Sequence, residues 1–153
     1  MSNESAKSIA IVQRLEWDAM HRIPGHEGAC KAYHGHRYAA EISATAENLD
    51  PLGRVVDFSV IEDKIGGWIK QHFDHTAILY AKDDEPSVKA VIEANQRLGK
   101  PVYLLDSYPT VENIAAELGR VSAELLAPHG VRVVSIRLWE TPQSSALWMA
   151  SRT

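Results

Sequence analysis

The chain has 153 residues, a formal net charge of −4 at neutral pH and apolar side chains at 45% of its positions. This length suits one domain with a core of its own. The weakly acidic balance argues against a nucleic-acid partner or an anionic membrane surface, and no apolar run approaches the roughly 20 residues that a membrane-spanning helix needs. The polar start of the chain does not resemble a secretion signal, and the single cysteine, Cys30, excludes an internal disulfide. We therefore expect a single domain over 1–153, cytoplasmic, with no nucleic acid and no membrane as partner.

The first half of the sequence predicts two strands, over 8–21 and 36–47. In the first strand the alternating apolar positions that include Trp17 continue to His21. In the second strand the alternating apolar positions share the face of His36. Each apolar face therefore ends in a histidine, and a polar group there is costly unless it is paired or coordinated.

The second half predicts helices followed by two more strands. Ser59 and Glu62 form a capping-box pattern, and Thr110 is a plausible N-cap of a later helix. The apolar spacing predicts helices over 59–73, 87–98 and 110–125, a short extended piece over 101–105, and strands over 131–141 and 145–151. Two strands, helices and two strands in this order indicate an α+β domain, an antiparallel sheet with helices on one face.

The segment from Cys30 to His36 contains the strongest chemical signal. His34 and His36 lie two residues apart, so in a strand both imidazoles point the same way and can share one metal ion. His21 ends the facing strand. Three nitrogen ligands with an open position are typical of a catalytic zinc, so we predict Zn²⁺ on His21, His34 and His36. Cys30 lies a few residues upstream and is a candidate nucleophile or base, although a free cysteine is more often a small buried apolar residue.

Four further residues outside this segment, Asp74, His75, Glu140 and Glu112, are also candidates for a functional role. Asp74-His75 follows a helix end, where the histidine either compensates the helix dipole or acts as an acid-base group tuned by the carboxylate. Glu140 could be an ordinary charge at the end of a strand. It continues the apolar face of that strand, however, which favours a buried carboxylate that accepts hydrogen bonds from N–H donors. Glu112 is an acidic residue in the first turn of a helix on the simplest reading.

Three basic side chains lie near the histidines in sequence. Arg22, Lys31 and Arg37 could contact an anionic substrate. Charged side chains at the surface are usually solvated, so we assign no role to any one of them.

Several segments resemble the 6-pyruvoyl-tetrahydropterin synthase superfamily when they are taken together and in order. They are Trp17-Asp18-Ala19-Met20-His21, Cys30-Lys31-Ala32-Tyr33-His34-Gly35-His36, Val56-Asp57-Phe58, Phe73-Asp74-His75, Pro109-Thr110-Val111-Glu112-Asn113 and Trp139-Glu140-Thr141. The match spans nearly the whole chain. Three residues separate Cys30 from His34, and this short spacing is similar to that of the bacterial 6-carboxy-tetrahydropterin synthase branch, which feeds queuosine synthesis.

The resemblance implies a tunnelling fold, or T-fold: a four-stranded antiparallel sheet in β-β-α-α-β-β order with helices on one face. In this fold three subunits close their sheets into a barrel and two trimers stack, so the resemblance implies a homohexamer. It also implies zinc on the three histidines already named.

The resemblance further implies the reaction and the roles of individual residues. Cys30 would be the base, and Asp74 and His75 would be its relay, which a neighbouring subunit could supply. Glu140 would anchor the pterin ring, and Thr110 and Glu112 would line its pocket. The expected reaction converts 7,8-dihydroneopterin triphosphate to 6-carboxy-5,6,7,8-tetrahydropterin, with loss of triphosphate and acetaldehyde.

Three alternatives remain open from the sequence. The same chemistry could stop earlier, at 6-pyruvoyl-tetrahydropterin. A non-catalytic metal-binding or oligomerisation module would keep the fold, but it would not need a base such as Cys30. A zinc hydrolase would need a carboxylate base near the metal, and the sequence has no His-Glu-X-X-His helix.

Overall fold

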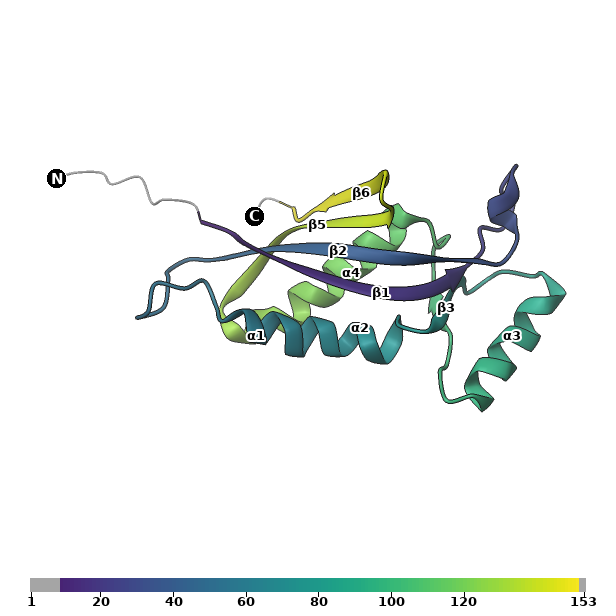
Figure 1. Ribbon diagram of the computed structural model, residues 1–153, viewed down its shortest axis with the longest axis horizontal. Coiled ribbons are helices and arrows are strands. Elements are labelled where there is room, and N and C mark those ends of the chain that lie inside the picture. The colour runs from purple at the N-terminus through teal and green to yellow at the C-terminus, as the bar shows by residue number, and fades with distance from the viewer. Residues whose placement is uncertain (1–8, 152–153) are drawn as a thin grey trace.

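The computed structural model describes residues 9–151, which form one mixed sheet with helices packed on it (Figure 1). The expected start of the first strand at Ser8 lies outside the described residues. The strands are β1 Ile11–His21, β2 His34–Ala46, β3 Thr76–Tyr80, β4 Tyr103–Leu105, β5 Val131–Thr141 and β6 Ser144–Met149. They lie in the order β4-β3-β1-β2-β5-β6.

The long antiparallel hairpin of β1 and β2 is the centre of this sheet. The alternation predicted from the sequence is confirmed, because Trp17, Ala19 and His21 of β1 are buried while the residues between them are more exposed. Tyr38 and Ile42 of β2 are fully buried on the same side. This side faces the main core, where burial of these apolar side chains supplies most of the driving force for folding.

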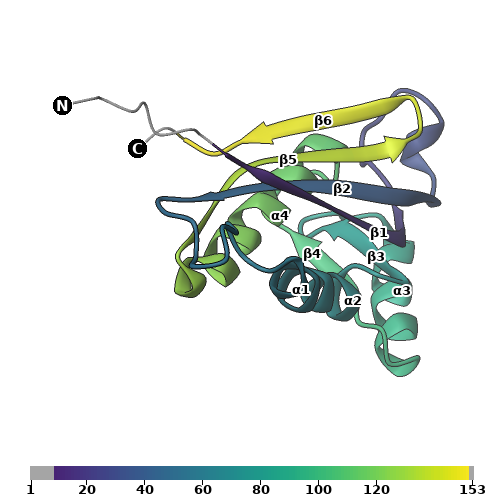
Figure 2. The same ribbon diagram turned by 60° about the vertical axis from the view of Figure 1, so that its left-hand side comes forward.

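The helices are α1 Phe58–Ile61, α2 Gly67–His72, α3 Pro86–Arg97 and α4 Val111–Leu126, with one π-helical turn, Glu62–Gly66, joining α1 to α2. Helices α1, α2 and α4 cover the core face of the sheet (Figure 2). The predicted N-cap Thr110 is confirmed, since its side chain accepts a hydrogen bond from the Asn113 N–H. The capping box expected at Ser59 is wrong: Asp57 caps α1 and accepts from the Ser59 N–H. None of the helices in the described part of the chain is long and apolar enough to cross a bilayer.

The expected four-stranded antiparallel sheet is wrong, because the sheet has six strands and is mixed. β3 pairs parallel with β1, and β4 pairs parallel with β3. The strand over Thr76–Tyr80 is not predicted from the sequence. This segment is buried on both faces, so its apolar residues run together without the alternation that marks a half-buried strand.

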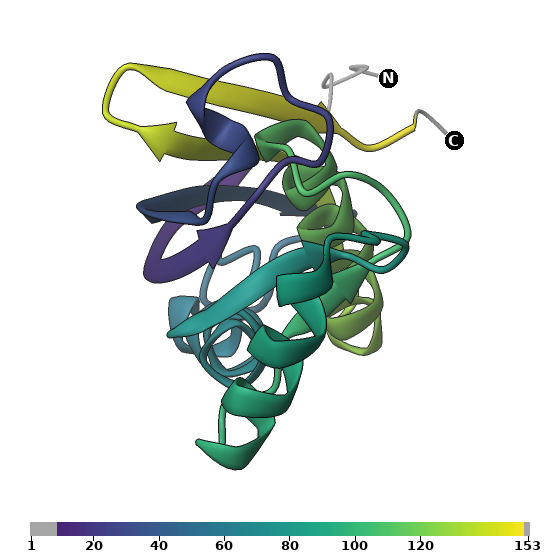
Figure 3. The ribbon, with the colours of Figure 1, turned by 90° about the vertical axis from the view of Figure 1, so that its right-hand side faces the viewer.

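The expectation of helices on one face also needs correction, because α3 packs on the other face of β3. Ile78 belongs to the main core, whereas its neighbours Ala77 and Leu79 form a second small core with Val88 of α3. Adjacent residues of a strand point to opposite faces, so the two cores lie on opposite sides of the sheet. The loop 22–33 and α3 lie at the same end of the molecule (Figures 1 and 3).

Candidate metal centre and active site

The register of the central hairpin brings three histidines together. His21 lies directly opposite His34, and Ala19 lies opposite His36, so all three imidazoles share one face of two neighbouring strands. Their ring centroids are 4.5 to 5.1 Å apart. One nitrogen from each of the three lies within 4.8 Å of the others, and the Sγ of Cys30 is not part of this group.

In two of these rings, a hydrogen bond to a backbone carbonyl determines which nitrogen carries the proton. The Nδ1–H of His21 donates to the Pro109 carbonyl over 2.8 Å, and the Nδ1–H of His34 donates to the Ala32 carbonyl over 2.8 Å. A carbonyl only accepts, so in each neutral ring the proton is on Nδ1 and Nε2 carries a lone pair. These two Nε2 atoms face each other at 2.9 Å. When a histidine ligates a metal through one ring nitrogen, a hydrogen bond donated by the other ring nitrogen orients the ring in this way.

The third histidine contributes a buried nitrogen next to a carboxylate. His36 Nε2 is buried and has no hydrogen-bond partner among the described residues, and Glu140 Oε1 lies 3.5 Å from it. Burial lowers the pKa of His36, and the charge of Glu140 partly opposes that shift. Glu140 lies beside an irregularity in the β5–β6 pairing, and it lines an open pocket of about 520 Å³ together with His36 and Trp139.

Burial also keeps His21 neutral. Its side chain is inaccessible to solvent, and this burial, reinforced by the charges of His34 and His36, lowers the pKa of His21 to about 4. Tyr38, whose hydroxyl oxygen lies 3.2 Å from His21 Nδ1, has a pKa raised by burial and by Glu140, so it stays a phenol. His21 is thus neutral at physiological pH, the protonation state that a metal ligand requires.

These residues fit a zinc ion. Imidazole nitrogens at about 2.0–2.1 Å from a tetrahedral metal lie about 3.3 Å apart, close to the 2.9 Å between the two Nε2 atoms. A cation would also satisfy the orphaned nitrogen of His36. Three imidazole ligands leave a fourth position for a substrate oxygen, as in catalytic zinc sites.

Cys30 lies in a short 3₁₀ turn, Ala29–Lys31, within the loop that joins β1 to β2. Its thiol is free and partly buried. The backbone N–H of Ile23 donates to the Cys30 carbonyl over 2.8 Å, so the two sides of this loop are joined at the cysteine.

Asp74 and His75 form a second cluster, which is separate from the three histidines. His75 Nδ1–H donates to Asp74 over 2.8 Å, and the same carboxylate accepts from the Asp18 N–H over 3.2 Å. Although partial burial opposes ionisation, these hydrogen bonds lower the pKa of Asp74 below its usual range. Asp18 points to the exposed face of β1, away from His21, and the His75 side chain is 70% exposed. Within one chain the Asp74–His75 pair therefore lies on the exposed side of the sheet, away from the three histidines.

His75 also has a backbone φ of 58°, which is uncommon for a residue other than glycine. Its N–H donates to the Asp18 carbonyl over 2.7 Å, which holds it in this conformation at the start of β3. Backbone strain of this kind is concentrated at functional sites.

Thr110 and Glu112, the two predicted pocket residues at the start of α4, do not line the same pocket as Glu140. Thr110 is partly buried and caps α4, and Glu112 is exposed in the first turn of that helix. Thr110 follows Pro109, whose carbonyl holds His21, so the start of α4 lies next to the histidine cluster.

Sequence reasoning missed the groups that orient the histidines. Pro109 and Ala32 act through their backbone carbonyls. Every residue has such a carbonyl, so the amino-acid types at these positions do not indicate the contact. The sequence does indicate that Tyr38 shares a face with His34 and His36, because the three residues alternate along one strand. The same pattern predicts only a core position for Tyr38.

Comparison with known proteins agrees with this geometry. The family model described as 6-pyruvoyl tetrahydropterin synthase matches residues 10–150. A curated protein of Rickettsia bellii, named 6-carboxy-5,6,7,8-tetrahydropterin synthase, is 44% identical over 135 residues, which cover 88% of this chain and 95% of that protein. The protein of the same name from Haemophilus influenzae is 27% identical over 88% of this chain and 94% of its own length.

Solved structures show the same fold. An uncharacterised protein from Wolinella succinogenes, WS1659, has a TM-score of 0.79 at 20% identity and covers 94% of this chain and 98% of its own. The 6-pyruvoyl tetrahydropterin synthase from Plasmodium vivax has a TM-score of 0.67 at 19% identity, covering 94% of this chain and 99% of its own. At these identities the likeness concerns the fold alone. The family match over almost the whole chain, together with the identity to curated relatives, shows that this chain belongs to the 6-pyruvoyl tetrahydropterin synthase family.

Proposed function

We propose that the protein is a zinc-dependent 6-carboxy-5,6,7,8-tetrahydropterin synthase, which converts 7,8-dihydroneopterin triphosphate with loss of triphosphate and acetaldehyde. The observation that carries this proposal is the cluster of three imidazoles beside Glu140, in a chain whose curated relatives bear that name. Carbonyl acceptors turn the Nε2 lone pairs of two of these rings, His21 and His34, toward each other. Its product would serve queuosine and related 7-deazapurine synthesis. A cytoplasmic setting belongs to the proposal, because Cys30 must stay a free thiol.

The three histidines would hold Zn²⁺, and the bound ion would act as a Lewis acid toward the side-chain oxygens of the substrate. His21 and His34 are prepared for this role by the carbonyls that fix their protons. Glu140 would accept hydrogen bonds from the amino group and ring N–H of the pterin and so orient it. Its position 3.5 Å from His36 supports a substrate that spans the carboxylate and the metal.

Cys30 would remove a proton from the substrate side chain as a thiolate. Asp74 and His75 would relay protons, with Asp74 holding His75 through the Nδ1–H hydrogen bond. Because this pair faces outward in its own chain, we assign it to the site of a neighbouring subunit. Thr110 and Glu112 would lie at the rim of the pterin pocket, at the start of α4.

The expected homohexamer, a dimer of trimers, is part of the same proposal. β4 and β6 are the edge strands of the described sheet, and β6 carries exposed apolar side chains, with Leu147 at 46% and Met149 at 69% exposure. An apolar edge strand is suited to pairing with another chain. Pairing of sheets between copies would cover this edge.

The alternative function with most support is conversion of the same substrate to 6-pyruvoyl-tetrahydropterin, without the loss of acetaldehyde. It is supported by the family model, which is described as 6-pyruvoyl tetrahydropterin synthase. A non-catalytic module is the second alternative. The test is to incubate the zinc-loaded protein with 7,8-dihydroneopterin triphosphate and to identify the products by mass spectrometry. We expect 6-carboxy-tetrahydropterin and acetaldehyde in equal amounts. A pyruvoyl product without acetaldehyde would favour the first alternative.

Cys30→Ala is the matched variant for this assay. We expect it to keep zinc and substrate binding and to lose at least about a hundredfold in turnover, because the general base is gone. Retained turnover would remove Cys30 from the mechanism, and absence of turnover in the parent protein would favour the non-catalytic module.

A further inference from the structure

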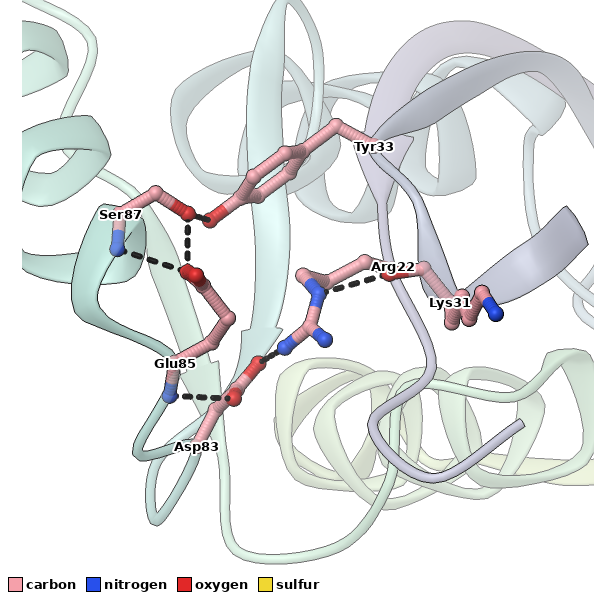
Figure 4. Close-up of polar contacts among 6 residues, drawn as sticks. All are labelled: Arg22, Lys31, Tyr33, Asp83, Glu85 and Ser87. Carbon is pink, nitrogen blue, oxygen red and sulfur yellow. Dashed lines mark hydrogen bonds and ion pairs between the residues drawn. The ribbon is translucent and has the colours of Figure 1, made fainter. Parts of the chain in front are cut away.

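Arg22 is a buried cation, contrary to the expectation that basic side chains near the histidines are solvated. Its relative exposure is 8%, and the carboxylate that it meets, Asp83, has a side chain only 2% exposed. Arg22 Nη1 donates to Asp83 Oδ2, and the two side chains form an ion pair (Figure 4). A desolvated ion pair of this kind is retained at a cost in hydration, so its place in the molecule needs a reason.

The second contact of Arg22 is with the loop that carries Cys30. Arg22 Nε donates to the Lys31 carbonyl over 2.9 Å, as Figure 4 shows. The carbonyls on either side are also held: Cys30 accepts from the Ile23 N–H over 2.8 Å, and Ala32 accepts from His34 Nδ1–H over 2.8 Å. The carbonyls of Cys30, Lys31 and Ala32 therefore each accept a hydrogen bond. Of the three donors, only Arg22 is a side chain that is itself anchored to a segment outside the hairpin.

Asp83 gives that anchor a rigid base. Its N–H donates to the carbonyl of Tyr80, the last residue of β3, and its Oδ1 accepts from the Glu85 N–H, both over 3.1 Å. β3 pairs with β1 up to His21, the residue before Arg22. The two ends of the ion pair thus start from neighbouring strands of one sheet.

A second tether joins the same turn to the far end of the loop. The hydroxyl of Tyr33 and Ser87 Oγ lie 2.8 Å apart, and Glu85 Oε2 accepts from the Ser87 N–H over 2.7 Å at the start of α3. The Arg22 guanidinium carbon lies 5.9 Å from the centroid of the Tyr33 ring. Both ends of the loop, at Arg22 and at Tyr33, are therefore fastened to residues 83–87 (Figure 4).

We propose that the turn 83–87 positions the Cys30 thiol through the buried Arg22–Asp83 pair, so that Arg22 and Asp83 are positioning residues for catalysis. The inference rests on the proposed function, in which Cys30 is the base. A proton transfer depends steeply on the placement of the accepting atom, and a misplacement of about 1 Å can cost about a hundredfold in rate. The guanidinium supplies a charge-assisted hydrogen bond to the carbonyl of Lys31, the residue after Cys30, which a neutral side chain would not match.

The test compares three variants of the full chain. Asp83→Asn removes the charge but keeps an acceptor for the Glu85 N–H. Arg22→Met combined with Asp83→Leu replaces both charges by apolar groups of similar size, so that no unpaired charge is buried and folding is preserved, yet the donor to Lys31 is lost. Asp84→Asn is the matched control, because Asp84 is exposed next to Asp83.

The first readout is the rate at which iodoacetamide alkylates the protein, since Cys30 is its only cysteine. We expect alkylation to be about threefold faster or more in Asp83→Asn and in the double variant, because the released loop opens more often. The second readout is kinetic: kcat should fall about tenfold or more while KM changes by less than about twofold. Asp84→Asn should leave both unchanged.

The double variant separates positioning from plain stability. If it recovers the parent alkylation rate and kcat, the ion pair only stabilises the fold and the proposal is overturned. If Asp83→Asn does not fold, Tyr33→Phe replaces it, because that variant loses one hydrogen bond of the second tether. Parent alkylation rates in both Tyr33→Phe and the double variant would equally overturn the proposal. The alkylation result does not depend on turnover, so it stands apart from any failure of the proposed reaction.

Discussion

Individual residues of the histidine cluster owe their chemistry to hydrogen bonds with the backbone. His21 and His34 each present Nε2 because a carbonyl takes the proton on Nδ1, and His21 stays neutral because burial lowers its pKa to about 4. A metal ion competes with protons for histidine nitrogens, so the neutral ring of His21 would bind one without first losing a proton. The site is therefore organised for a cation before the ion arrives.

Removal of one ligand tests the cluster at this scale. His34→Ala should lower the zinc content from about one per chain to less than about a tenth of that, because two imidazoles cannot hold the ion against dialysis. Metal analysis after dialysis against a weak chelator measures this. The control is His129→Ala, since His129 is exposed in the 3₁₀ turn that follows α4 and is not one of the three clustered imidazoles. An unchanged zinc content in His34→Ala would refute the ligand assignment.

At the scale of elements, the contact of α4 with the sheet depends on one glycine. Gly119 is buried under the ring of Trp148 on β6, and a Cβ at this position would lie only 2.5 Å from that ring. The absent side chain lets the helix approach the strand closely. Gly67, in contrast, has helical φ and ψ angles of −61° and −42° and no atom near the position of a Cβ.

These two glycines predict opposite effects of the same substitution. Gly119→Ala should lower the free energy of unfolding by about 1–3 kcal/mol, because the rigid indole has to move. Gly67→Ala should raise it by up to about 1 kcal/mol, since alanine favours the helix and nothing obstructs it. Urea unfolding monitored by tryptophan fluorescence measures both. Equal effects of the two substitutions would contradict this account of α4 packing.

At the scale of the whole molecule, Asp74 and His75 point outward, so under the proposed function a single chain would lack a complete set of catalytic groups. The pair lies on the exposed side of β1, whereas the three histidines point into the core side. A neighbouring copy that contributes its own pair would complete each site. Under this proposal activity would depend on assembly.

Complementation between two inactive variants tests that arrangement. Cys30→Ala and His75→Ala should each be inactive alone. When equal amounts are unfolded together and refolded, about a quarter of the sites in randomly mixed assemblies should contain both intact groups, so about a quarter of parent activity should return. The control is a mixture of Cys30→Ala with Cys30→Ser, which should stay inactive. Failure of the first mixture to recover activity would place the pair and the thiol in the same subunit.

The sequence by itself determined the central hairpin and its histidines. Alternation of apolar residues assigned the faces of β1, β2 and β5, and a spacing of two placed His34 and His36 on one side, since side chains of a strand alternate whatever the rest of the chain does. The order of motifs along the chain identified the family. Local patterns were sufficient here because each depends on the geometry of one strand or one turn.

Only the tertiary structure decided the rest. β3 is buried on both faces, so its pattern carries no alternation, and its parallel pairing with β1 depends on contacts across the sheet. The burial of Arg22 depends on Asp83, a residue 61 positions away, and the protons on His21 and His34 depend on carbonyls that no residue type reveals. These features arise where distant segments meet, and residue patterns along the chain do not record which backbone atoms or charges will meet there.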